Sequence, residues 1–325
     1  MTRKAAQGAL MGACLTAFAL MTVVATGHAA ETLAEKLGYS AQDKLLIIHA
    51  DDVGMCHSVN RATIDALQKG IVTCGSIMVP CPWLPEIAAY CREHPEVDLG
   101  LHLTLNCEWG KYRWGPVASR SEVPTLLDKD GYMWHGEMDT VLHASPAEVE
   151  KELRAQIEKA LQLGIKPTHL DSHMGTIFVR PDYINIYVKL AKEYNIPPLA
   201  FEYTDELGEY LGSPAAKMLS VWINAIKEKG FPLLNNVIPD VGGTLETKKQ
   251  AYENALRNLK PGVTELIVHL GFADDELRAI TGSAPRRQFD YEFFTAETTR
   301  KLMGELGIKL VGWKDLKKLC TPEQK

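Results

Sequence analysis

The chain has 325 residues, of which 46% are hydrophobic and 23% charged; these proportions are ordinary for a globular enzyme with one large α/β domain or two small ones. Its formal net charge is -6. A nucleic-acid-binding protein would need a basic face to neutralise phosphates, so this balance argues against nucleic acid as a partner.

The first thirty residues have the features of a signal peptide. Arg3 and Lys4 precede a largely apolar stretch at 5–25, and small residues follow at 27–30. The pattern predicts export to the periplasm or the medium, with residues 31–325 as one mature domain that is not integral to the membrane. Two alternatives stay open, namely an uncleaved membrane anchor and lipidation at Cys14.

Apolar runs and amphipathic segments alternate along the mature sequence. Strands of a parallel sheet covered on both faces are expected at 44–50, 71–79, 97–103, 167–171, 198–201, 264–270 and 309–313. Helices are expected at 58–69, 84–92, 145–163, 183–194, 218–229, 248–259 and 296–306. The segment 106–141 is irregular and predicts a long functional loop. Repeated strand–helix units predict a closed or nearly closed (β/α) barrel, with a doubly wound open sheet as the alternative.

Acids and histidines end several of the predicted strands. These residues are Asp51, Asp52, His102, His169, Asp171, His173 and His269. Because the carboxyl ends of barrel strands point at one mouth, we expect these side chains to share a pocket. One carboxylate and two imidazoles can bind a divalent metal, a second carboxylate can accept the proton of a metal-bound water, and another imidazole can protonate a leaving amine. Together these groups suffice to hydrolyse an amide.

Asp51 and Asp52 are adjacent, which suits a division of labour. Consecutive side chains at a strand end point in different directions, so we expect only one of the two to bind the metal. The alternative is that this pair begins a loop or caps the following helix, as aspartates often do.

The histidines also have structural alternatives. His102 lies between two leucines and could be a hydrogen-bonded residue of the core. His169, Asp171 and His173 are spaced by two, which places them on one strand face, where one can bind the metal while another orients it. For His269 a structural role is equally open.

Three motifs follow one another along the chain. They are Ile-His-Ala-Asp-Asp-Val-Gly-Met at 48–55, Gly-Leu-His-Leu-Thr at 100–104 and Pro-Thr-His-Leu-Asp-Ser-His at 167–173. In this order they resemble the YdjC-like carbohydrate deacetylases, which include the chitooligosaccharide deacetylases. The resemblance runs from about Lys44 to Trp313. It implies a distorted, single-domain TIM-like (β/α) barrel, related to the NodB-type polysaccharide deacetylases, and a divalent metal, commonly Mg or Zn.

The resemblance also implies roles for single residues. By motif position, Asp52, His102 and His173 match the metal ligands, and Asp51 matches the catalytic base. His269 is similar to a late histidine that can serve as the acid. Arg287 and Asp290 resemble a late Arg-x-x-acidic element that supports the site, with a solvated surface pair as the alternative.

The loop at 106–141 is rich in aromatic residues, among them Trp109 and Trp114. Aromatic rings can cover the apolar faces of sugar rings while polar edges remain free to hydrogen-bond. We therefore expect Trp109 and Trp114 to form part of the sugar site. The alternative is that these rings pack the loop onto the barrel.

Taken together, the sequence predicts a metal-dependent hydrolase that removes acetyl groups from N-acetylated sugars, such as chito-oligosaccharides or related glycans. The same groups would serve a metal-dependent esterase or phosphoesterase. A non-catalytic glycan-binding protein is a third alternative, but binding alone would have no use for the base Asp51. The expected partner is an acetylated sugar or oligosaccharide, and a homodimer remains open.

Overall fold

The computed structural model describes residues 31–202, 222–224, 226–228 and 230–320. Residues 1–30, with the predicted signal peptide and Cys14, therefore lie outside the described residues, as does much of the helix expected at 218–229. Within the described part, no helix has the length and apolar character needed to cross a membrane. All six cysteines in this part are free thiols, five of them buried.

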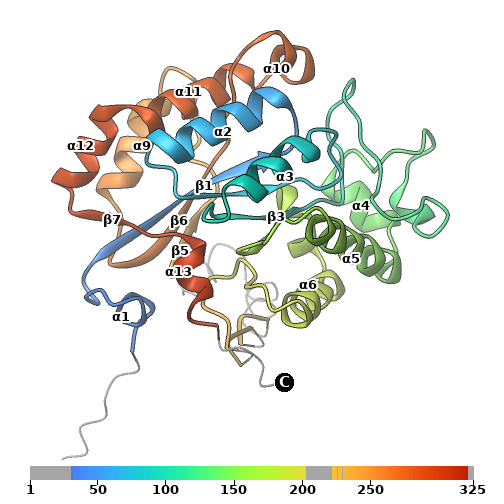
Figure 1. Ribbon diagram of the computed structural model, residues 1–325, viewed down its shortest axis with the longest axis horizontal. Coiled ribbons are helices and arrows are strands. Elements are labelled where there is room, and N and C mark those ends of the chain that lie inside the picture. The colour runs from blue at the N-terminus through green and yellow to red at the C-terminus, as the bar shows by residue number, and fades with distance from the viewer. Residues whose placement is uncertain (1–30, 203–221, 225, 229, 321–325) are drawn as a thin grey trace, which may run out of the picture. The chain divides into compact units, whose positions relative to one another are not determined.

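Strand β1 (Lys44–Val53) lies at the centre of a seven-stranded parallel sheet (Figure 1). One of its edges pairs with β6 (Gly262–Val268), which in turn pairs with β5 (Asn236–Ile238). Strand β1 also pairs with β7 (Ile308–Leu310) through its first residues and with β2 (Cys74–Ile77) through its last. Strands β3 (Leu99–Leu103) and β4 (Leu170–Ser172) follow beyond β2. Because all pairs are parallel, the carboxyl ends of these strands meet at one edge.

Isolated bridges join the two ends of this sheet. Leu170 in β4 bridges Pro198, and Phe201 bridges Leu234, which lies just before β5. The segment 197–202 thus takes the place of a complete strand, and the sheet curls into a distorted TIM-like (β/α) barrel. This confirms the predicted fold class over the alternative of an open doubly wound sheet.

Helices cover the outside of the sheet (Figure 1). Helices α2, α9, α11 and α12 lie together on one side, and α5 and α6 lie on another. The helices are α1 (Leu33–Lys36), α2 (His57–Lys69), α3 (Leu84–Glu93), α4 (Glu137–His143), α5 (Pro146–Gln162), α6 (Pro181–Glu193), α9 (Lys248–Arg257), α10 (Asp275–Ile280), α11 (Ala284–Thr295), α12 (Glu297–Glu305) and α13 (Trp313–Lys317). Two 3-10 segments are η1 (Pro124–Leu126) and η2 (His173–Val179). Residues 222–224 and 226–228, which are described within the helix expected at 218–229, are also helical.

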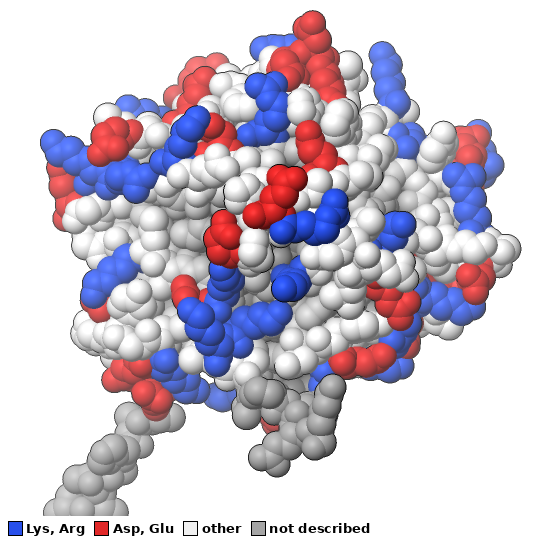
Figure 2. Space-filling view, viewed as in Figure 1, with Lys and Arg blue, Asp and Glu red and all other residues white. Residues whose placement is uncertain are grey.

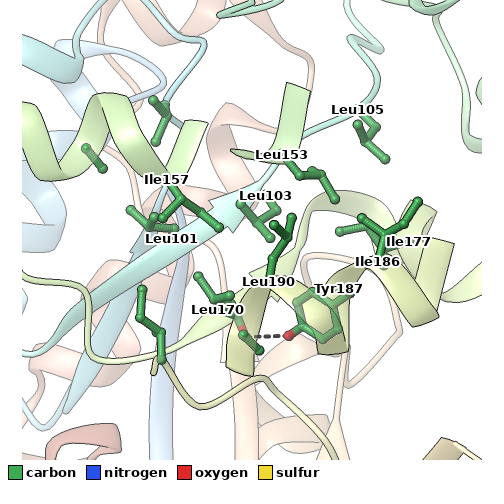
Figure 3. Packing of buried hydrophobic residues seen from close by; sticks show 14 of the residues in the cluster. Leu101, Leu103, Leu105, Leu153, Ile157, Leu170, Ile177, Ile186, Tyr187 and Leu190 are labelled. Carbon is green, nitrogen blue, oxygen red and sulfur yellow. Dashed lines mark hydrogen bonds between the residues drawn. The ribbon is translucent and has the colours of Figure 1, made fainter. Parts of the chain in front are cut away.

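Leucine and isoleucine side chains fill the space between the sheet and the pair α5–α6 (Figure 3). Leu101 and Leu103 of β3 face Leu153 of α5 and Leu190 of α6 there, and all four are at most 1% exposed. Burying each such side chain stabilises the fold by roughly 1.5–3 kcal/mol. The Tyr187 hydroxyl also donates to the Leu170 carbonyl at 2.6 Å, which fixes α6 against β4 (Figure 3).

Several parts of the expected element order differ from the structure, among them strand β5, which was not expected. Trp313 was expected in the last strand, but β7 ends at Leu310 and Trp313 is the first residue of α13. Helix α11 was not expected, because its sequence mixes charged and aromatic residues without a clear apolar face. The position of α11 matters for the site, since it carries both Arg287 and Asp290.

Candidate metal and catalytic site

The carboxyl ends of four strands surround one pocket of about 560 Å³. Asp51 and Asp52 reach it from β1, His102 from β3, and Asp171 from β4, while His269 follows β6 directly. His173, which follows β4, also lines the pocket. The convergence expected from the strand ends is therefore present in the structure.

Asp52, His102 and His173 converge on one point in this pocket. Oδ1 of Asp52 lies 3.4 Å from Nε2 of His102 and 3.3 Å from Nδ1 of His173. All three residues are at most 3% exposed, and Oδ1 of Asp52 has no hydrogen-bond partner. A buried carboxylate oxygen without a partner is costly, and a cation held between the three atoms would remove that cost. One carboxylate and two imidazoles suit a divalent metal such as zinc, so this group could hold the predicted ion.

The second nitrogen of each imidazole is held by a carboxylate. His102 Nδ1 is 2.7 Å from Oδ1 of Asp171, whose other oxygen accepts a hydrogen bond from Ser76 at 2.8 Å. His173 Nε2 is 3.0 Å from Oε2 of Glu108. Such contacts fix the ring orientation and leave the opposite nitrogen free for a metal. Asp171 thus has an orienting position, a role that the sequence left open among His169, Asp171 and His173, whereas Glu108 was not identified from the sequence.

Arg287 makes a buried ion pair with Asp52. Its Nη2 donates to Oδ2 of Asp52 at 2.5 Å, and the guanidinium lies 5.9 Å from the ring centroid of Trp109. Burial by itself would raise the pKa of Asp52, but Arg287 and the two neighbouring histidines hold this pKa well below its ordinary value. Asp52 is therefore a carboxylate at neutral pH, as a metal ligand must be.

Asp290 lies one helical turn from Arg287 and is also buried, at 2% exposure. One of its oxygens is 2.8 Å from Nζ of Lys248, and the other accepts from the backbone N–H of His269 at 3.3 Å. The alternative of a solvated surface pair is therefore wrong for Arg287 and Asp290. Both residues brace the site, Arg287 through Asp52 and Asp290 through His269.

Both aspartates of β1 face the pocket, although strand alternation predicted different directions. Oδ2 of Asp51 lies 3.7 Å from the same His102 nitrogen that Asp52 approaches. The backbone explains the difference: Asp52 has a φ of 67°, and the register with β2 shifts between Ala50 and Val53. A left-handed conformation is unfavourable for a residue other than glycine, and such strain is found mainly at functional sites.

His49 lies beneath the pocket and contacts Asp51. Its Nδ1 is 2.8 Å from Oδ1 of Asp51, and its Nε2 is 2.7 Å from Nε2 of His169. Burial would lower the pKa of His49, but the carboxylates of Glu265, Asp51 and Asp171 raise it to about 9. A protonated His49 therefore faces the candidate base at neutral pH. The sequence could have indicated this contact, because the alternation of side chains along β1 puts residues 47, 49 and 51 on one face of the strand.

His169 is part of this buried layer and does not line the pocket. Burial and the neighbouring positive charge of His49 hold the pKa of His169 well below its ordinary value, so it is neutral. Trp313 stacks on its ring with centroids 4.8 Å apart, and the indole N–H donates to Oε2 of Glu265 at 2.7 Å. The sequence left open whether His169 binds the metal, orients a ligand or contacts the substrate. In the structure it contacts His49, which in turn contacts Asp51.

His269 faces the pocket opposite this layer. Its Nε2 is 3.9 Å from Oδ2 of Asp51, and its side chain is 40% exposed. Desolvation by the surrounding protein lowers the pKa of His269, because it disfavours the charged imidazolium. His269 is therefore mainly neutral at neutral pH, so it must take up a proton before it can act as a general acid.

The aromatic residues of the 106–141 loop do not form the pocket wall. Neither Trp109 nor Trp114 is among the lining residues; their rings pack edge-to-face with centroids 5.5 Å apart. Trp114 is 3% exposed and its indole N–H donates to the carbonyl of Asn106 at 3.1 Å. Its position fits the alternative, in which these rings hold the loop on the barrel.

Replacing Trp114 by alanine is therefore expected to destabilise the fold, by about 3–5 kcal/mol, because the change removes a large buried ring. The free energy of unfolding in urea measures this effect. Trp134→Ala serves as a matched control, because Trp134 lies in the same loop and is only partly buried. An unchanged unfolding free energy for Trp114→Ala would contradict the packing role.

Comparison with known proteins places this geometry in a family. The YdjC-like protein family matches residues 45–305. A carbohydrate deacetylase of Thermus thermophilus is 33% identical over 273 residues, covering 84% of this chain and 94% of that protein. One of Brevibacillus brevis is 26% identical, covering 83% and 99%. A crystal structure from Enterococcus faecalis, of a proposed cellobiose-phosphate cleavage protein, has a TM-score of 0.69 and 25% identity, covering 84% of this chain and 99% of that one. The chain therefore belongs to the YdjC-like family.

Proposed function

We propose that this protein is a metal-dependent carbohydrate deacetylase, which hydrolyses the acetamide of an N-acetylated sugar to an amine and acetate. The observation that carries this proposal is the buried group Asp52–His102–His173 with a second carboxylate, Asp51, beside it in one pocket. The relatives in Thermus thermophilus and Brevibacillus brevis, both named carbohydrate deacetylases, support the same substrate class.

Each polar group of the pocket has a task in this reaction. A divalent metal held by Asp52, His102 and His173 would polarise the acetamide carbonyl and lower the pKa of a water molecule. Asp51 accepts the proton of the attacking water as the new C–O bond forms. His269, whose Nε2 is 3.9 Å from Oδ2 of Asp51, takes up that proton and donates it to the nitrogen as the C–N bond breaks, so that the sugar leaves as an amine and the acetyl group as acetate.

The rest of the pocket suits a sugar with an acetyl group. Phe201, Val237 and Ile267 give part of the wall an apolar surface. Such a surface can cover the acetyl methyl group and the apolar face of a sugar ring, while the polar groups fix the orientation. The volume of about 560 Å³ lies within the usual range for small-molecule sites, roughly 300–1,000 Å³.

Removal of the metal tests the proposal directly. Dialysis against a chelator is expected to stop acetate release from N-acetylglucosamine oligomers, and addition of Zn²⁺ or Mg²⁺ is expected to restore it, because the attacking water depends on the ion. Chelator already saturated with metal serves as the control. Acetate release that is undiminished after metal removal would contradict the mechanism. Hydrolysis of O-acetyl or phosphate esters, with no acetate from N-acetylated sugars, would favour the esterase or phosphoesterase alternative.

A further inference from the structure

The pocket carries more negative than positive charge. Its lining includes five carboxylates, those of Asp51, Asp52, Glu108, Asp171 and Glu202. Among the described residues of the lining, Arg287 is the one lysine or arginine, and it is bound to Asp52. A divalent metal, Arg287 and the protonated His49 beneath Asp51 together supply four positive charges against these five. The pocket therefore remains negative even with the ion bound, and an anionic ligand would meet a repulsive potential.

Glu202 is the carboxylate whose charge is least compensated. Its Oε2 accepts a hydrogen bond from Nδ2 of Asn235 at 3.1 Å, and within the described part of the chain no ion pair compensates it. Asn235 is itself fixed, because its Oδ1 accepts from the backbone N–H of Val263 in β6 at 2.8 Å. The backbone N–H of Glu202 donates to the carbonyl of Leu234 at 2.7 Å. A neutral amide thus holds this carboxylate in place and leaves its charge intact.

Glu202 and Glu108 reach the pocket from different parts of the barrel. Glu202 belongs to the segment 197–202, which closes the barrel between β4 and β5, whereas Glu108 belongs to the loop after β3. Glu108 is bound to His173 and is 23% exposed, so its charge is partly engaged in the metal site. Glu202 is therefore the carboxylate best placed to act on a substituent of the substrate.

We propose that this pocket, acting in the deacetylation proposed above, selects sugars that are neutral or carry an amine and rejects sugars that carry a phosphate or carboxylate group. A phosphate would be placed near Glu202 and Glu108 without a basic side chain to receive it. An amine would be attracted by the same carboxylates. A partly deacetylated oligosaccharide carries such an amine, so it remains a ligand after its first acetyl group has been removed.

Four versions of one disaccharide test this selection at fixed pH and saturating metal. They are N,N'-diacetylchitobiose, its 6-phosphate, its 6-O-methyl ether, and the disaccharide in which one acetamide is replaced by a free amine. We expect kcat/KM for acetate release to be at least about tenfold lower for the phosphate than for the parent sugar, and lower still at low ionic strength. The methyl ether separates size from charge and is expected to react like the parent. Glu202→Lys is expected to reduce the ratio of kcat/KM for the parent sugar to kcat/KM for the phosphate. Glu297→Lys, the same charge change at an exposed position of α12, is expected to leave this ratio unchanged.

Binding measurements keep this proposal separate from the proposed function. Calorimetry with His269→Gln, which is expected to bind with little turnover and keeps all five carboxylates of the lining, gives the affinity for each of the four sugars. Weaker binding of the phosphate than of the parent supports the selection even if no sugar releases acetate, an outcome that would overturn only the deacetylation. Binding of the phosphate that equals or exceeds binding of the parent sugar would overturn the proposed selection against anionic sugars, while deacetylation stands. The same ratio of kcat/KM between parent and phosphate in Glu202→Lys and wild type would overturn it too.

Discussion

Asp52→Asn is expected to remove the bound metal and to lower kcat/KM for acetate release by about a thousandfold or more, since the Lewis-acid contribution is worth several kcal/mol. Oδ1 of Asp52 lies between His102 and His173, so the change takes the negative charge from the centre of the candidate ligand set. It also leaves the buried guanidinium of Arg287 without its counter-ion. Metal content after dialysis and the rate of acetate release measure the two effects.

A matched control is needed because loss of a buried ion pair can cost about 3–5 kcal/mol of stability. Asp290→Asn removes a similar buried partner, that of Lys248, without touching the three candidate ligands. Both variants are expected to unfold at lower urea concentration, but only Asp52→Asn is expected to lose the metal. Retention of a stoichiometric ion by Asp52→Asn would exclude this residue as a ligand.

Asp51→Asn is expected to separate proton transfer from metal binding. An amide cannot accept the proton of the attacking water, so kcat is expected to fall by about 10²–10⁴-fold. Metal content is expected to stay the same, because the three candidate ligands are unchanged. Steady-state kinetics of acetate release and metal analysis of the same preparation provide both readouts.

Two further variants are controls for the loss of activity expected in Asp51→Asn: one changes a carboxylate outside the pocket, and the other changes the side chain next to Asp51. Asp65→Asn changes a carboxylate on α2 outside the pocket and is expected to keep full turnover. His49→Asn keeps the Asp51 carboxylate but removes the imidazole 2.8 Å from it, so a smaller loss is expected. Full turnover by Asp51→Asn would mean that another group accepts the proton.

The meeting of the site residues could be predicted because it depends on sheet topology. Apolar runs ending in acids or histidines mark the carboxyl ends of β1, β3, β4 and β6, and in a parallel barrel these ends share one mouth. The placement of Asp52, His102 and His173 in one pocket follows from that rule. Their chemical roles stay predictions that the variants above test.

The remaining details depend on local geometry that the residue pattern does not contain. Alternation fails at Asp52 because its left-handed backbone turns a second carboxylate into the pocket. Glu108 lies in a loop without periodicity, so nothing in the pattern places it beside His173. Trp114 shows a further limit, because an aromatic residue in a loop can pack inward as readily as it can face a ligand.

Trp313 lies beyond residue 305, where the match to the YdjC-like family ends, yet it stacks on His169 and binds Glu265 beneath the candidate base. Strand β7, which precedes it, pairs with the first residues of β1. A nascent chain made only as far as residue 305 would therefore carry every candidate metal ligand on an unfinished barrel. Completion of the site is tied to the last stage of synthesis, and a prematurely terminated product would lack the contacts that lie beneath the candidate base.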